Sequence, residues 1–180
     1  MLRRSAVIAS IVTALVGSVA QAQVSYWWAG GGPILPMGDS KKAFDTGWML
    51  DAGIARVIVP KHSSLQLQVS YGSNPVKSST LNSTLYSAFG NITYGLLGDD
   101  AKLSPYVYGG LGIVSTKTGG TYSTSRSDFG YQGAGGVSYT INKKWSAFGE
   151  ARYMSAGSGT TRITIMPLLF GFSANVGVMP

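Results

Sequence analysis

Short segments in which apolar and polar residues alternate run through most of the chain. The clearest covers residues 65–72, with the sequence LQLQVSYG, where every odd position is apolar and every even position is polar or glycine. A period of two predicts a β-strand with one apolar face. Beyond residue 22 no segment shows the longer period of a helix, so the pattern predicts an all-β fold.

The same reasoning predicts eight strands along the chain. They cover residues 24–32, 48–59, 65–72, 85–96, 105–114, 129–139, 145–154 and 163–176. Most are about ten residues long and nearly free of charge, which is what a tilted strand needs to cross a bilayer. Pro167 cannot donate a ladder hydrogen bond, so we expect a β-bulge there. The expected fold is an eight-stranded antiparallel up-and-down transmembrane β-barrel.

Most charged residues fall between these segments, in connections of unequal length. Residues 60–63, 98–102 and 142–143 form short turns, whereas 33–46, 74–83, 115–128 and 156–161 form mostly longer, polar loops. Short turns on one side and longer loops on the other are typical of outer-membrane barrels, whose short side is periplasmic.

Composition supports a barrel in a membrane. The chain has 25 glycines, mostly inside the strands, where they allow a narrow sheet to coil, and it has no cysteine, which argues against a disulfide-stapled secreted scaffold. Aromatic residues near strand ends predict girdles at the membrane interfaces, although β-propensity alone would also favour them. These residues are Tyr26, Trp28, Trp48, Tyr71, Tyr94, Tyr139, Trp145 and Tyr153.

The first 22 residues have the pattern of a signal peptide. Arg3 and Arg4 give a positive start, residues 6–19 form a short apolar run, and Ala20–Gln21–Ala22 is a small-x-small cleavage site. We therefore expect a signal peptide at 1–22 and one barrel domain at 23–180.

Several short motifs extend the argument beyond periodicity. They are GGP at 31–33, PMGD at 36–39, DTGW at 45–48, PYVYGGLG at 105–112, GAGGV at 133–137, FGEARY at 148–153 and MPLLFGF at 166–172. With them the chain resembles the small outer-membrane β-barrel domain family, the eight-stranded OmpA/OmpX-like proteins. The resemblance implies export to the cell outer membrane of a Gram-negative-type cell and insertion by the outer-membrane assembly machinery. One departure is the end of the chain, VGVMP, where such barrels usually carry a terminal aromatic residue.

Charges within the strands identify the candidate site. Strand parity places Glu150 and Arg152 on the polar face of one strand and Asp51 on the polar face of another, and Gln132 shares that lumen-facing side. Buried charges must be paired, so these residues predict a lumen polar network. Two interpretations remain: a structural salt-bridge network that plugs the barrel, or a gated polar pathway for protons or small ions.

Signs of other chemistry are weak. His62 is the sole histidine and lies in an expected turn, without the partners that nucleophilic catalysis or a metal site requires, so we expect no enzyme, cofactor or metal. The whole chain has a net charge of +7, and the charged residues beyond the signal peptide are spread over loops at both ends of the barrel. This favours anionic lipid and lipopolysaccharide over nucleic acid as partners of a monomer.

Three functions are open at this point. The first is a non-enzymatic outer-membrane barrel with a structural or surface-interaction role through its extracellular loops. The second is a narrow pore or carrier for small molecules. The third is a secreted, lipocalin-like ligand-binding barrel, which would need an apolar interior.

Overall fold

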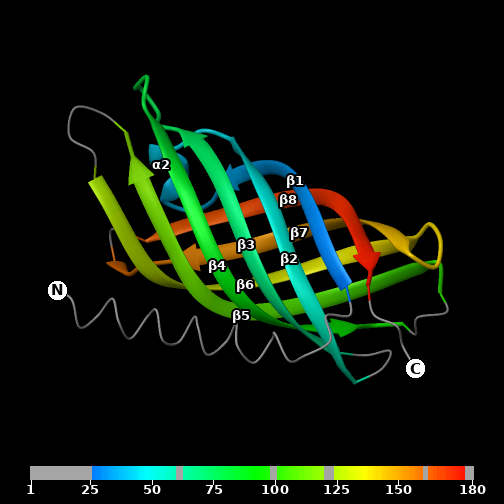
Figure 1. The fold of residues 1–180 in the computed structure, drawn as a ribbon. Helices are drawn as coiled ribbons and strands as arrows, with labels where there is room; N and C mark the ends of the chain where they lie inside the picture. The colour runs from blue at the N-terminus through cyan, green and yellow to red at the C-terminus, as the bar shows by residue number, and fades with distance from the viewer. Residues whose placement is uncertain (1–25, 60–62, 98–100, 120–123, 160–161, 177–180) are drawn as a thin grey trace.

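Alternation along the chain produces eight antiparallel strands that close into a barrel, with β1 paired to β8 (Figure 1). The computed structural model describes residues 26–59, 63–97, 101–119, 124–159 and 162–176. The strands are β1 (Tyr26–Pro36), β2 (Gly47–Val59), β3 (Ser63–Pro75), β4 (Asn82–Gly95), β5 (Leu103–Thr118), β6 (Thr124–Thr140), β7 (Trp145–Ala156) and β8 (Ile163–Asn175). The expected barrel fold is confirmed. The expected signal peptide and His62 lie outside the described residues.

The outward faces of the strands are mostly apolar, whereas many polar residues point into the lumen. In β3, Val69 and Tyr71 are exposed on the outer face, whereas Gln68 is buried in the lumen. Ile92, 62% exposed, shows the same orientation on β4. A water-soluble barrel would bury these apolar side chains, so the outer surface is suited to lipid.

The register between strands fixes the tilt of the barrel. Starting at Tyr26 and following paired residues through all eight strands leads back to Pro36, ten residues further along β1. Such a stagger tilts the strands by roughly 40° and closes a lumen just wide enough for side chains to fill.

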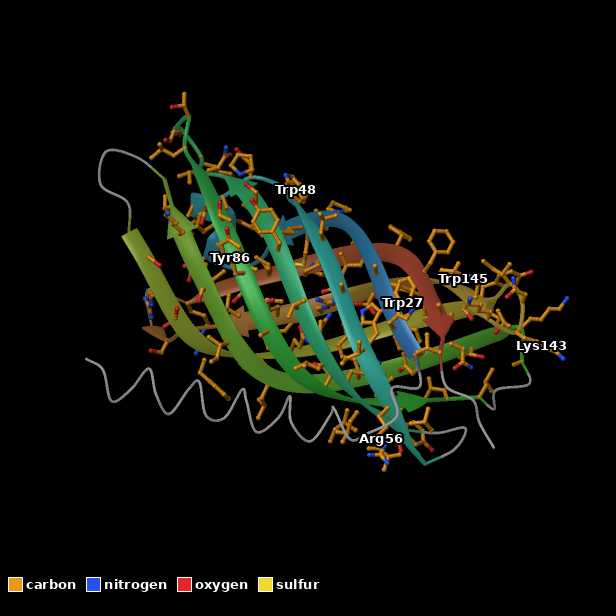
Figure 2. All side chains as sticks on the ribbon, viewed as in Figure 1. Trp27, Trp48, Arg56, Tyr86, Lys143 and Trp145 are labelled. Carbon is orange, nitrogen blue, oxygen red and sulfur yellow. The ribbon has the colours of Figure 1, made fainter. Side chains whose placement is uncertain are left out.

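Aromatic side chains form outward-facing groups near both ends of the barrel. Toward the loop end, Tyr71 packs 5.4 Å from Trp48 and 5.1 Å from Tyr86, measured between ring centroids. At the opposite end, Trp27 meets Trp145 edge-on at 5.6 Å (Figure 2). The expectation that Tyr26 and Trp28 belong to an interface girdle is wrong. Even-numbered residues of β1 face the lumen, so both rings point inward, and Trp27 lies on the outer face instead.

Strand ends and irregularities differ from the sequence expectation in several places. β1 continues to Pro36, and β5 and β6 extend through most of the expected loop 115–128, because Ser and Thr can pair in a ladder as well as in a loop. A one-turn helix, α2 (Ser40–Ala43), lies in the first loop. The expected bulge at Pro167 is absent, since the register is the same on both sides of it; the irregularity lies between Val57 and Val59. No helix among the described residues is long and apolar enough to span a membrane.

Gly53 on β2 occupies a position where no side chain fits. A Cβ atom there would collide with the indole ring of Trp28, which lies across it in the lumen. By contrast, a Cβ atom at Gly135 on β6 would meet nothing within 4 Å, because that position faces outward.

We expect Gly53→Ala to destabilise the barrel by about 1–3 kcal/mol, because the added methyl group must push the Trp28 ring aside. Gly135→Ala should change stability by less than about 0.5 kcal/mol. Urea unfolding in detergent micelles measures both, and near-ultraviolet circular dichroism should show loss of tryptophan packing in the Gly53 variant alone. Equal stability of the two variants would contradict this packing.

Candidate functional site: a polar network in the barrel lumen

Arg152 on β7 is the most deeply buried charged residue of the lumen, with 1% of its surface exposed. Its guanidinium faces Asp51 on β2, and Nη1 and Nη2 donate to the two carboxylate oxygens at 3.2 and 3.1 Å. This bidentate geometry joins opposite walls of the barrel, since β7 and β2 are not neighbours.

Asp51 accepts further hydrogen bonds from three lumen side chains. Ser70 Oγ donates at 2.6 Å, and Trp28 Nε1 donates at 3.2 Å. Gln68 Nε2 lies 2.9 Å from each carboxylate oxygen. These donors replace the hydrogen bonds to water that a carboxylate loses when it is buried.

Glu150, also on β7, provides the second carboxylate beside the guanidinium. Two tyrosines of β5 hold this carboxylate in turn. Arg152 Nη2 donates to its Oε1 at 2.7 Å and Nε does so at 3.2 Å. The hydroxyls of Tyr108 and Tyr106 donate to Oε1 and Oε2 at 2.7 and 2.9 Å. The guanidinium also lies over the Tyr108 ring, with 5.8 Å between Arg152 Cζ and the ring centroid.

Gln132 on β6 belongs to the same lumen layer but does not touch the charged residues. Its Nε2 donates to Gln68 Oε1 and, at 2.7 Å, to Asn91 Oδ1. Asn91 Nδ2 in turn donates to Gln68 Oε1 at 2.9 Å. Gln132 therefore reaches Asp51 through Gln68, and its own Oε1 has no hydrogen-bond partner in the structure.

Above this network, toward the loop end, apolar side chains fill much of the lumen, together with a few polar ones such as Ser87. Ile34, Leu85 and Val114 lie near the loop ends of β1, β4 and β5 and are almost fully buried. Together they form an apolar cap over the polar network; its members are Ile34, Met49, Leu85, Phe89, Val114, Met154, Ala156, Ile165 and Leu169. A smaller cluster of Trp28, Ala55 and Phe148 lies below.

The structure brings together the residues that strand parity singled out. Asp51, Glu150 and Arg152 form one ion-paired group. Gln132 is linked to this group through Gln68. The sequence pattern does not reveal that Trp28, Tyr106 and Tyr108 donate to the carboxylates. Aromatic residues in a strand are equally typical of an interface girdle or of ordinary β-propensity. Sequence reasoning also missed the apolar cap, although the inward parity of Met49 and Phe89 carried that signal.

This arrangement is a buried group of one cation between two carboxylates. The guanidinium has carboxylates on two sides, and among the described residues no three acidic or histidine side chains gather as a metal site would require. The hydrogen bonds connect residues of seven strands, β1 to β7, so the network cross-links the barrel through its centre.

Comparison with known proteins decides which barrel this is. The family model for the outer membrane protein beta-barrel domain matches residues 6–175. The chain belongs to this family. It is therefore a protein of the Gram-negative outer membrane, and the alternative of a secreted, lipocalin-like barrel is wrong, as the outward apolar face also indicates.

Solved structures with this fold differ in what they do. Neisserial surface protein A has 16% identity and a TM-score of 0.65, covering 83% of this chain and 96% of its own. The N-terminal barrel of Pseudomonas aeruginosa OprF has 16% identity and a TM-score of 0.53, covering 84% and 98%. The outer membrane enzyme PagL has 14% identity and a TM-score of 0.53, covering 84% and 100%. None of the curated proteins compared with the sequence matches it. At these identities the likeness shows the fold alone.

Proposed function

We propose that this outer-membrane barrel is non-enzymatic and non-conducting, and that it acts through its extracellular loops in surface interaction. The observation that carries the proposal is the filled lumen: a charge-paired network across the barrel, closed toward the loop end by the apolar cap. A small ion would have to displace both layers to pass. The filled lumen therefore favours a scaffold that presents loops, rather than a pore or a carrier.

The acidic residues of the loop end are engaged in ion pairs. Asp39 pairs with Lys42 at 2.8 Å, and Asp128 pairs with Arg126 at 2.6 Å. Asp45 lies 3.9 Å from Lys77. Carboxylates held in this way help to order the loops, which supports a binding surface rather than an acid–base site.

The first loop is tied to the rim instead of extending freely. Thr164 of β8 donates its N–H to Ser40 Oγ at 2.9 Å, and Met37 donates to the Thr164 carbonyl at the same distance. On the other side, Phe44 bridges to Val76 in the second loop. Two loops are thus fixed relative to the barrel mouth, which pre-organises a contact surface.

Three loop-end cations have no carboxylate partner among the described residues: Lys41, Lys117 and Arg162. All three are exposed. Lys117 points outward at the end of β5, above the aromatic side chains of the outer surface, at the level of lipopolysaccharide headgroups.

Among proteins of similar fold, Yersinia pestis Ail was solved with the heparin analogue sucrose octasulfate, with 13% identity and a TM-score of 0.52, covering 83% of this chain and 95% of that one. We propose lipopolysaccharide phosphates as the partner of these cations.

A charge-removal series tests the proposed surface. Changing Lys41, Lys117 and Arg162 together to glutamine should weaken lipopolysaccharide binding by more than about tenfold, since each cation near an anionic surface contributes about 1 kcal/mol. Isothermal titration in detergent micelles measures this. Arg56→Gln, at the opposite end of the barrel, is the matched control and should bind like wild type. Unchanged binding by the triple variant would contradict the proposed partner.

A further inference from the structure

The outer surface of the barrel carries an apolar groove across β6, β7 and β8. It has a volume of about 370 Å³, and eight residues line it: Gly135, Gly136, Val137, Gly149, Glu150, Ala151, Leu168 and Phe170. Six of the eight have outward parity, so the groove opens to the lipid; Gly136 and Glu150 have inward parity. The groove therefore lies on the outer side of the strand that carries Glu150 and Arg152 into the lumen.

The groove exists because two outward positions lack side chains. A Cβ atom at Gly135 would have no neighbour within 4 Å, so this position leaves open space between larger residues. Gly149 forms the adjacent floor, and the ring of Phe170 borders it, 3.2 Å from where a Cβ atom would lie. Val137 and Leu168 complete the walls.

Below the groove, the β6–β7 turn places two lysines at the membrane interface. Lys143 and Lys144 are exposed and have no carboxylate partner among the described residues. They lie at the end of the barrel that carries the first residue of β1 and the last of β8, which is periplasmic in this family. Lys143 projects from the tip of this end, and Trp145 lies further in, beside Trp27 (Figure 2).

The turn that carries the lysines is held in place. Asn142 Oδ1 accepts hydrogen bonds from the N–H groups of Lys144 and Trp145, both at 2.9 Å. The N–H of Asn175 on β8 donates to the Lys144 carbonyl at 2.9 Å. The backbone that carries the two lysines is therefore held at this end of the groove.

The spacing between charge and groove matches one lipid molecule. Gly149 follows Lys144 by five residues, or about 17 Å along the strand direction, which is about 13 Å along the membrane normal at a tilt of roughly 40°. One leaflet of the hydrocarbon core is about 15 Å deep. A phosphate at the lysines thus places the middle of its own acyl chain in the groove.

We infer that this face binds an anionic phospholipid of the periplasmic leaflet, with one acyl chain in the groove and the headgroup phosphate on Lys143 and Lys144. The two lysines match the negative charge, and the apolar walls match a saturated chain. Trp145 lies beside the glycerol region, where amphipathic rings are favoured. Phosphatidylglycerol has this chemistry, whereas a zwitterionic lipid lacks the net charge.

Native mass spectrometry of protein released from vesicles of phosphatidylethanolamine and phosphatidylglycerol tests the inference. Wild type should retain phosphatidylglycerol in preference to phosphatidylethanolamine. The double variant K143Q/K144Q should lower that preference at least about fivefold, since one cation near an anionic surface contributes about that factor. Gly135→Leu, which fills the groove, should lower the retention of phosphatidylglycerol while leaving the barrel folded.

Two matched controls separate the site from general effects. Gly90→Leu adds a side chain at another outward glycine with open space, and Lys102→Gln removes an exposed lysine from a different turn at the same end. Both should retain lipid like wild type. Equal retention of the two lipids by wild type, or unchanged retention in Gly135→Leu and K143Q/K144Q, would overturn the inference. A dimer that Gly135→Leu disrupts without any change in lipid retention would also overturn it and assign the groove to a second copy of the chain.

Discussion

Arg152→Ala is expected to destabilise the folded barrel by about 3–5 kcal/mol, the cost of leaving buried charges without their partner. The variant removes the only cation that contacts Asp51 and Glu150 among the described residues, and both carboxylates are almost fully buried. Glu150→Gln should cost less, because the amide oxygen can still accept from Tyr108 and the guanidinium, and the amide N–H can donate to the Tyr106 hydroxyl oxygen.

The matched control for Arg152 is the ion pair at the loop end of the barrel. Arg126 pairs with Asp128 over a similar distance, but the Arg126 side chain is 38% exposed. Arg126→Ala should therefore change stability by about 0–1 kcal/mol. Urea unfolding of the barrels in lipid vesicles compares the three variants. If Arg152→Ala were no more destabilising than Arg126→Ala, the lumen network would not be a structural element.

The second large effect concerns the outer surface. Val69 lies at the middle of β3 and is 54% exposed, so Val69→Arg places a charge near the bilayer midplane, which costs about 2–4 kcal/mol. Ile58, 52% exposed, lies near the periplasmic end of β2, where the same substitution costs about 0–1 kcal/mol. Folding into lipid vesicles, followed by the gel shift between heated and unheated samples, measures both. Equal effects would mean that the two residues lie at the same membrane depth.

Much of this structure follows from a pattern of period two. The alternation over residues 65–72 fixed both the strand and its orientation, because one slip in register would turn every apolar side chain inward. The same parity placed Asp51, Glu150 and Arg152 in the lumen. Since isolated charge is costly there, their pairing could be expected before their contacts were known.

What parity could not supply was depth and distance across the barrel. Trp28 and Trp27 are adjacent and chemically alike, yet one donates to Asp51 and the other packs on Trp145 outside. Choosing between them requires the register of β1 against its neighbours. Likewise, the apolar cap gathers residues from most of the strands, and only the closed barrel shows that they lie at one level.

Loop boundaries do not follow from composition in this chain. Residues 115–118 and 124–128 are rich in serine and threonine, which suit an exposed loop and an exposed strand equally well. In the structure they continue the β5–β6 hairpin, where Ser115 Oγ and Ser127 Oγ lie 2.6 Å apart. Pairing with a neighbouring strand, rather than local composition, decides their conformation.

The central claim is that the lumen is closed by the Arg152 network and the apolar cap. Single-channel recording in planar lipid bilayers tests it most directly, with insertion verified independently by the gel shift of the reconstituted protein. The wild-type barrel should give no steady conductance under conditions in which it is fully inserted. A stable, ion-selective conductance in wild type, abolished by Arg152→Ala, would contradict the account and favour a polar pathway through the barrel.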